Sequence, residues 1–128
     1  MISLPHLLNF VVTSLEQCPL FDSVDILSTH LFSASQFVIK VRAVTEGRTL
    51  MLQVRYYGNA NHLDYAYQLV KDDTPILRWD NKEHFPSLTT HPHHFHQADG
   101  RVESSPLTGD PEHDLPLVLD YLLALPAR

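Results

Sequence analysis

Residues 37–70 read FVIKVRAVTEGRTLMLQVRYYGNANHLDYAYQLV, and within them apolar and polar side chains alternate in three successive segments. A period of two is typical of β-strands with one buried face. The connections between the segments, Glu46-Gly47 and Gly58 to Asn61, have compositions that suit hairpin turns. We therefore predict an antiparallel meander whose strands are Phe37 to Thr45, Thr49 to Tyr57 and His62 to Val70.

These turns also set a register that can be tested on the sequence. A slip of one residue would move the apolar side chains of a strand to the opposite face of the sheet. The predicted register places Ile39 beside Val54, and Val54 beside Tyr65. The apolar residues of all three strands then share one face, which we assign to the core.

A fourth strand is predicted for Thr74 to Asp80, after a turn at Lys71 to Asp73. Taken literally, this turn places Leu77 opposite Tyr67 and Trp79 opposite Tyr65, so Trp79 belongs to the core. On the other, polar face the same register sets three charged residues in one row: Arg55, Asp64 and Asp80.

Two amphipathic helices flank these strands, because apolar residues recur three and four positions apart near both termini. Ser3 can cap the first helix, which Pro19 ends, and Asp114 can cap the last one, with Pro116 in its first turn. Short strands are also possible at residues 24–29 and 101–104. We predict one domain over residues 1–128 of the α+β class, with an antiparallel sheet of about four to six strands and both helices packed on one face.

The amino-acid composition limits which cellular compartment and which binding partners we expect. The single Cys18 excludes an intramolecular disulfide and a thiolate zinc site. No apolar run approaches the roughly 20 residues that span a bilayer, and no signal-type segment follows Met1. We therefore expect a cytoplasmic protein that does not enter a membrane. The net charge of −6 argues against nonspecific attachment to nucleic acid, so RNA binding would need a local basic face.

Residues 78–96 read RWDNKEHFPSLTTHPHHFH and hold five of the nine histidines. Pro86 and Pro92 argue against a helix or a central strand here, so we predict an ordered loop that leaves the sheet beside the polar face. Imidazole titrates near neutral pH and binds metals. A loop of this composition is therefore the candidate active site.

One interpretation is metal-independent cleavage of RNA, in which a 2′-hydroxyl attacks the adjacent phosphate. This reaction needs a base, an acid and a cation for the charged phosphorane. Histidines can serve as base and acid, and Arg78, with Arg55 or Lys40 beside it, can bind the phosphate. Asp80 or Asp64 can orient a histidine or the arginine. The candidate catalytic residues are Arg78, Asp80, Asn81, His84, His93, His94 and His96.

Three other interpretations remain open. In a metal-dependent hydrolase, His91, His94 and His96 would hold a divalent ion; the ribonuclease interpretation requires no cofactor. In a noncatalytic binding module, the polar face would engage a partner protein or a nucleotide. In a purely structural interpretation, Asp80 and Asn81 only form the turn that ends a strand.

The motifs within residues 65–96 resemble those of the TumE-like family of small bacterial and archaeal proteins, which are regarded as toxins of toxin-antitoxin pairs. Two sequence differences stand out: many relatives carry His-His-Pro where this chain has His84, Phe85 and Pro86, and some carry lysine where Phe95 stands. The resemblance covers most of the chain and rests on RWDN at residues 78–81, on His84 and Pro86, on the pattern T-x-P-H-H-x-H at residues 90–96, and on Tyr65-x-Tyr67-Gln68.

The resemblance implies a toxin role and a cognate antitoxin, expected to be a helix-turn-helix protein encoded next to it. RNA is the expected substrate if the chain is a ribonuclease. Exposed sheet edges would also permit a homodimer.

Overall fold

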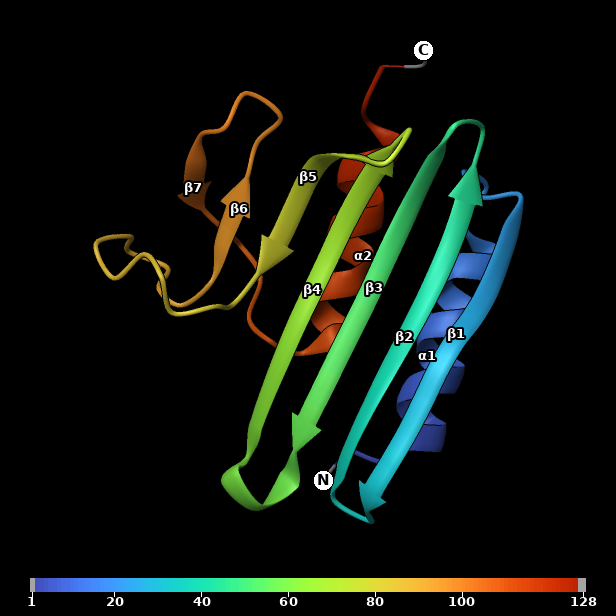
Figure 1. Cartoon of the computed structure of the whole chain (residues 1–128), viewed down its shortest axis with the longest axis vertical. Coiled ribbons are helices and arrows are strands. Elements are labelled where there is room, and N and C mark those ends of the chain that lie inside the picture. The colour runs from blue at the N-terminus through green and yellow to red at the C-terminus, as the bar shows by residue number, and fades with distance from the viewer. Residues whose placement is uncertain (1, 127–128) are drawn as a thin grey trace.

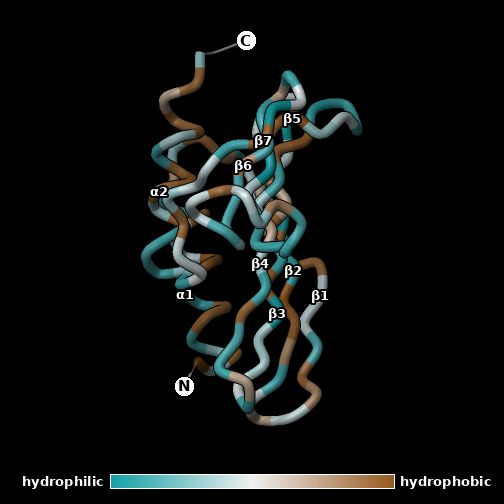
Figure 2. The backbone as a smooth tube through the Cα atoms, turned by 90° about the vertical axis from the view of Figure 1, so that its left-hand side faces the viewer, coloured by the Kyte–Doolittle hydropathy of each residue, from teal (hydrophilic) through white to brown (hydrophobic). Residues whose placement is uncertain are grey.

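The computed structural model describes residues 2–126, which form a seven-stranded antiparallel sheet and two helices (Figure 1). The strands lie side by side in chain order, and both helices cover one face while the other stays open (Figure 2). The α+β meander is thus confirmed, with one strand more than expected. The elements are α1 (Leu4–Gln17), β1 (Ser23–Ser33), β2 (Gln36–Thr45), β3 (Arg48–Tyr57), the 3-10 turn η1 (Gly58–Ala60), β4 (His62–Lys71), β5 (Thr74–Asp80), β6 (His94–His96), β7 (Val102–Ser104) and α2 (Pro111–Leu123).

The core lies between the helices and the apolar face of β2, β3 and β4. Ile39 pairs with Val54, and Val54 pairs with Tyr65, which confirms the predicted register of these strands. All three side chains are buried. Burial of a side chain of this size contributes roughly 1.5–3 kcal/mol, so the alternation supplies much of the stability of the sheet.

Strand β5 does not have the predicted register. Trp79 pairs with Tyr67 rather than Tyr65, because the turn contains only Asp72 and Asp73 and a bulge follows at Ile76. The shorter turn and the bulge each shift the pairing by one position, so the strand is displaced by two positions and keeps its face. Trp79 therefore stays in the core as predicted. Arg55 lies opposite Asp64 as predicted, but Asp80 does not belong to this row, since it lies opposite Ala66.

The loop predicted for residues 78–96 ends in a strand. His94–His96 forms β6 between β5 and β7, and Pro92 precedes it, where a missing N–H removes no ladder hydrogen bond. Phe95 anchors β6 on the helix side of the sheet: its ring stacks on Trp79 at 4.6 Å and meets Tyr121 of α2 edge-on at 5.3 Å. His94 and His96 therefore point to the open face.

Helix α2 begins earlier than predicted. Asp110 caps it by accepting a hydrogen bond from the Glu112 N–H, whereas Asp114 was predicted as the cap. Asp114 is fully buried and accepts hydrogen bonds from the N–H groups of Thr108 and Gly109, which lead into the helix. Pro116 consequently lies inside α2 rather than in its first turn.

Within residues 2–126, neither helix has the length and the apolar character needed to cross a membrane.

Candidate active site

Four polar residues meet on the open face where β5 and β6 pair. Arg78 lies opposite His96, and Asp80 lies opposite His94. Side chains that face each other across two antiparallel strands have Cβ atoms about 4.5–5.5 Å apart, so the four form one cluster. We call Arg78, Asp80, His94 and His96 the polar block.

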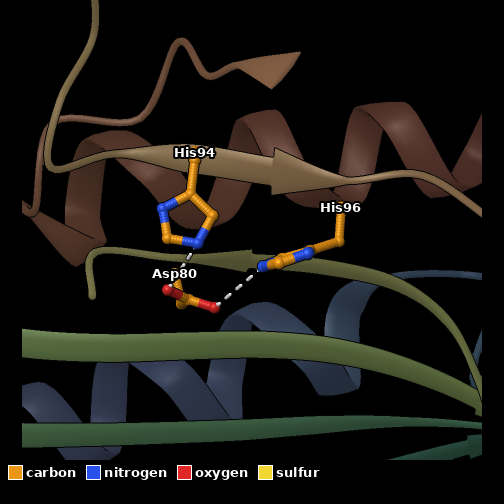
Figure 3. Close-up of side chains that lie close together, drawn as sticks. All are labelled: Asp80, His94 and His96. Atoms are coloured by element: carbon orange, nitrogen blue, oxygen red, sulfur yellow. Dashed lines mark ion pairs between the residues drawn. The ribbon is translucent and has the colours of Figure 1, made fainter. Parts of the chain in front are cut away.

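Asp80 is the centre of the polar block. Its carboxylate is 3% exposed and accepts hydrogen bonds from Nε of Arg78 at 2.7 Å and from the N–H of Lys82 at 2.9 Å. Nε2 of His94 is 3.0 Å from Oδ1, and Nε2 of His96 is 3.6 Å from Oδ2 (Figure 3). A buried carboxylate is stable only with such partners. Asp80 therefore fixes the positions of the Arg78 guanidinium and of the two imidazoles around it.

One hydrogen bond shows which ring nitrogen of His94 carries a proton. Nδ1 lies 3.0 Å from the carbonyl oxygen of Pro92. A carbonyl oxygen only accepts, so Nδ1 carries a proton. Nε2 is the nitrogen that faces the Asp80 carboxylate, and this contact is an ion pair only when Nε2 also carries a proton. Without that proton, a lone pair on Nε2 faces Asp80 and is free to bind a metal ion.

Phe85 covers His94 of the polar block, and its role was not predicted from the sequence. Its ring lies edge-on to His94 at 4.8 Å and to His96 at 5.9 Å. The side chain of His94 is left 2% exposed, whereas those of His96 and Arg78 are each 35% exposed. A ligand on the open face can therefore reach His96 and Arg78 directly, but not His94.

The pKa of His96 is lowered from the ordinary histidine value of 6.5. Burial is the main cause, and the positive charges of His94 and Arg78 add to it, while Asp80 opposes it. His96 is therefore largely neutral at pH 7, which is the form that accepts a proton.

Asn81 was predicted as catalytic, and the structure places its side chain away from the open face. Its Oδ1 accepts a hydrogen bond from the N–H of Tyr65 at 3.0 Å, and its Nδ2 donates to the carbonyl of Leu63 at 2.8 Å. Both bonds continue the hydrogen bonding between β4 and β5 by one residue after β5 ends at Asp80. Asn81 is 6% exposed, so this arrangement serves the backbone rather than a ligand.

His93 lies on the helix side of the sheet and is separate from the polar block. Its ring stacks on Tyr65, and the two side chains share a hydrogen bond of 2.8 Å at Nδ1. Burial, with the charges of Asp114 and Asp80, raises the pKa of Tyr65, so the phenol keeps its proton. Burial also lowers the pKa of His93. Both shifts keep this pair neutral.

The remaining histidines of the segment are exposed. His84 lies beside Phe85, and its charge contributes to the lowered pKa of His96, so it is within electrostatic range of the polar block. His91 is not part of the block. The metal ligands predicted as His91, His94 and His96 are therefore not the set that the structure assembles.

A different group has the positions of metal ligands. One ligand atom each from Asp80, His94 and His96 lies within 4.8 Å of the other two. Two imidazoles and one carboxylate are a donor set that zinc and other divalent transition metals accept.

The chain was compared with known proteins. The family model described as Toxin TumE matches residues 11–125, nearly the whole chain. No curated protein and no solved structure gives a significant match.

Proposed function

Since this chain belongs to the TumE toxin family, we propose that it acts as a metal-independent ribonuclease through the polar block. The family makes it the toxin of a toxin-antitoxin pair. The ribonuclease activity is our inference. It is carried by one observation: His96 and Arg78 stand next to each other on an open face, and both are accessible to a ligand.

The proposed reaction starts with His96. Its neutral imidazole accepts the proton of a ribose 2′-hydroxyl, whose oxygen forms a bond to the adjacent phosphorus. Arg78 donates hydrogen bonds to the phosphate oxygens as negative charge develops. Nε and Nη1 of Arg78 already bind Asp80 and Gln68, and the other N–H donors of the guanidinium remain for the substrate.

The bond from phosphorus to the 5′-oxygen then breaks, and this oxygen needs a proton. His84 is the candidate acid, because it is exposed and within electrostatic range of His96. The products are a 2′,3′-cyclic phosphate and a free 5′-hydroxyl. His94 and Asp80 are positioning residues in this scheme, since Phe85 covers His94 and Asp80 holds Arg78 in place.

Purified toxin incubated with total cellular RNA in the presence of EDTA tests this proposal. Cleavage should survive EDTA and fall at least about 100-fold in His96→Ala, the magnitude expected for loss of a general base. His93→Ala is the matched control, because its histidine comes from the same segment but lies on the helix side. A His96→Ala protein that is folded and cleaves at the normal rate would overturn the role of His96.

A metal-dependent hydrolase is the second candidate. It is favoured by the bond from Nδ1 of His94 to the Pro92 carbonyl, an arrangement common in metal-binding histidines. The nitrogen-oxygen distances of 3.0 and 3.6 Å also bracket the roughly 3.3 Å that separates neighbouring ligand atoms around tetrahedral zinc. The ion would make a bound water a nucleophile near neutral pH. Loss of all cleavage in EDTA, restored by zinc, would favour this candidate over the first.

We further propose a helix-turn-helix antitoxin as the partner, and the cytoplasm as the compartment, because RNA is available there.

We also propose that the protein forms a homodimer through β1. This edge strand is exposed on both faces and carries Ile26, Leu31 and Phe32, which are 51%, 60% and 55% exposed. Its backbone groups along the free edge are open to a second strand. Asp25, the only Asp, Glu, Lys or Arg in β1, is paired with Arg42 at 3.1 Å, so two antiparallel copies of β1 bring no like charges together.

A further inference from the structure

The open face has a hollow beside the polar block. It has a volume of about 320 Å³ and lies over β2 to β5, on the face turned to the viewer in Figure 1. Ala66 is the smallest side chain that lines it, and it leaves space between the longer side chains of the neighbouring strands. We call this feature the basic hollow, and its charged or polar lining includes Lys40, Gln53, Arg55, Asp64, Gln68, Arg78 and Lys82.

The basic hollow concentrates positive charge on an acidic protein. Four of the nine lysines and arginines of the chain line it, but only one of the fifteen carboxylate residues does. That residue, Asp64, shares a hydrogen bond of 2.7 Å with Nε2 of His62. The chain as a whole has a net charge of −6. Arg78 is itself paired with Asp80, so a local surplus of about two positive charges stands against an opposite background, and it attracts anions.

Three of the four cations are available to a ligand. Among the described residues, Lys40, Arg55 and Lys82 form no ion pair. Cations that stabilise a fold are usually found beside a carboxylate, as Arg42 is beside Asp25. Three unpaired cations around one depression repel one another, and an anionic ligand would relieve that repulsion.

Arg78 links the basic hollow to the polar block, because it lines the hollow and also binds Asp80. The strand register gives the extent of this surface. Lys40, Gln53, Ala66 and Asp80 lie in one row across β2, β3, β4 and β5. Three strand spacings separate Lys40 from Asp80, roughly 14 Å. A ligand that reaches both is therefore larger than one phosphate group.

We propose that the basic hollow binds the backbone of single-stranded RNA next to the phosphate that is cleaved. This inference rests on the proposed ribonuclease function and adds the substrate class. The volume is at the lower end of the roughly 300–1,000 Å³ of ligand pockets, enough for a nucleotide. No complementary strand fits inside a depression of this size, so the substrate is single-stranded. Lys40, Arg55 and Lys82 bind phosphates, and Arg78 delivers the next phosphate to His96.

Binding can be measured apart from cleavage. The probe is a fluorescent single-stranded 2′-O-methyl RNA octamer, which has no 2′-hydroxyl to attack the phosphate. The Lys40→Gln/Arg55→Gln variant should bind it about tenfold or more weakly, and the slope of log affinity against log salt should fall by about 1.4. The matched control is Arg48→Gln/Lys71→Gln, which removes two cations from the far end of the same sheet and should leave affinity within about twofold. Equal urea midpoints would confirm that both variants are folded.

The outcomes separate the two proposals. Weaker octamer binding in the hollow variant alone supports the basic hollow, even if the toxin cleaves no RNA. Cleavage of RNA with unchanged octamer binding in that variant would contradict RNA binding by the basic hollow but would still support the ribonuclease activity. Absence of octamer binding by the unmodified toxin would also contradict RNA binding by the basic hollow. Displacement of the octamer by polyglutamate at a concentration equal to or below that of unlabelled octamer would assign the hollow to an acidic protein instead.

Discussion

Asp80 and His94 lie opposite each other on β5 and β6, with 3.0 Å between a carboxylate oxygen and Nε2, and both side chains are almost fully buried. Asp80→Asn keeps the shape of this contact but removes its charge. His94 and Arg78 would then face no anion, and we expect the free energy of unfolding in urea to fall by about 3 kcal/mol. Asp99→Asn, which breaks an exposed pair with Arg101, should change it by less than about 1 kcal/mol. Equal effects of the two substitutions would contradict a central role for Asp80.

The pH dependence of cleavage should report His96. Its pKa lies below 6.5 and it acts as the neutral base, so the rate should decline as the pH falls below about 6.5. The low-pH decline should be absent from the residual activity of His96→Gln and present in His93→Gln, although the pKa of His93 is lowered as well. A decline that follows His93 instead would move the base to the helix side.

The same two histidines should make stability depend on pH. Their pKa values are lower in the folded chain than in the unfolded chain, so the unfolded chain binds more protons as the pH falls through 6.5. The contribution of these histidines to the free energy of unfolding should therefore be complete above about pH 6.5 and should decline as the pH falls below that value. Urea midpoints at pH 7.5, 6.5 and 5.5 would measure this, and a His93→Gln/His96→Gln variant should lose less over that range.

Asn81→Ala separates a structural from a catalytic role. The substitution leaves the N–H of Tyr65 and the carbonyl of Leu63 without their buried partner. We expect the free energy of unfolding to fall by about 1–3 kcal/mol. Cleavage per folded molecule, measured at a temperature where both proteins are folded, should stay within about twofold. A loss of cleavage comparable to that of His96→Ala would instead place Asn81 in the chemistry.

Alternation was sufficient to predict β2, β3 and β4, because each has ten residues with one buried face. The register of β5 was not predictable from turn composition. Asp72 and Asp73 both adopt positive φ angles in a two-residue turn. Pro75, directly before the bulge at Ile76, is compatible with a bulge but does not give the size of the register shift. The face of β5 was still correct, since an even displacement preserves it.

The composition of the site was largely visible in the sequence, whereas its division between two faces was not. Three residues are too few to show a period, so β6 was taken for a loop. Once β6 is recognised as a strand, Phe95 is the only apolar residue between two histidines, and His94 and His96 must share a face. The cover by Phe85 comes from the path of a loop, which no local pattern specifies.

The proposed dimer predicts a change of mass in solution. Leu31→Ser/Phe32→Ser should convert a dimer of the toxin into a monomer, as measured by light scattering after gel filtration. Leu123→Ser is the control, because Leu123 is 47% exposed on α2, away from β1. A wild-type protein that is already monomeric at high concentration would contradict the dimer.

The shortness of β6 has a consequence for the dynamics of the toxin. Within residues 2–126, the strand pairing beyond β5 comprises three residues on β6 and three on β7, and Phe95 is the side chain of β6 that is held between Trp79 and α2. Regions with few such contacts open by local fluctuations, without unfolding of the whole domain. The amide hydrogens of β6 should therefore exchange with deuterium before those of β3 and β4. The toxin would then lose its site below its melting temperature, and any ligand that clamps β6 against β5 would slow that exchange.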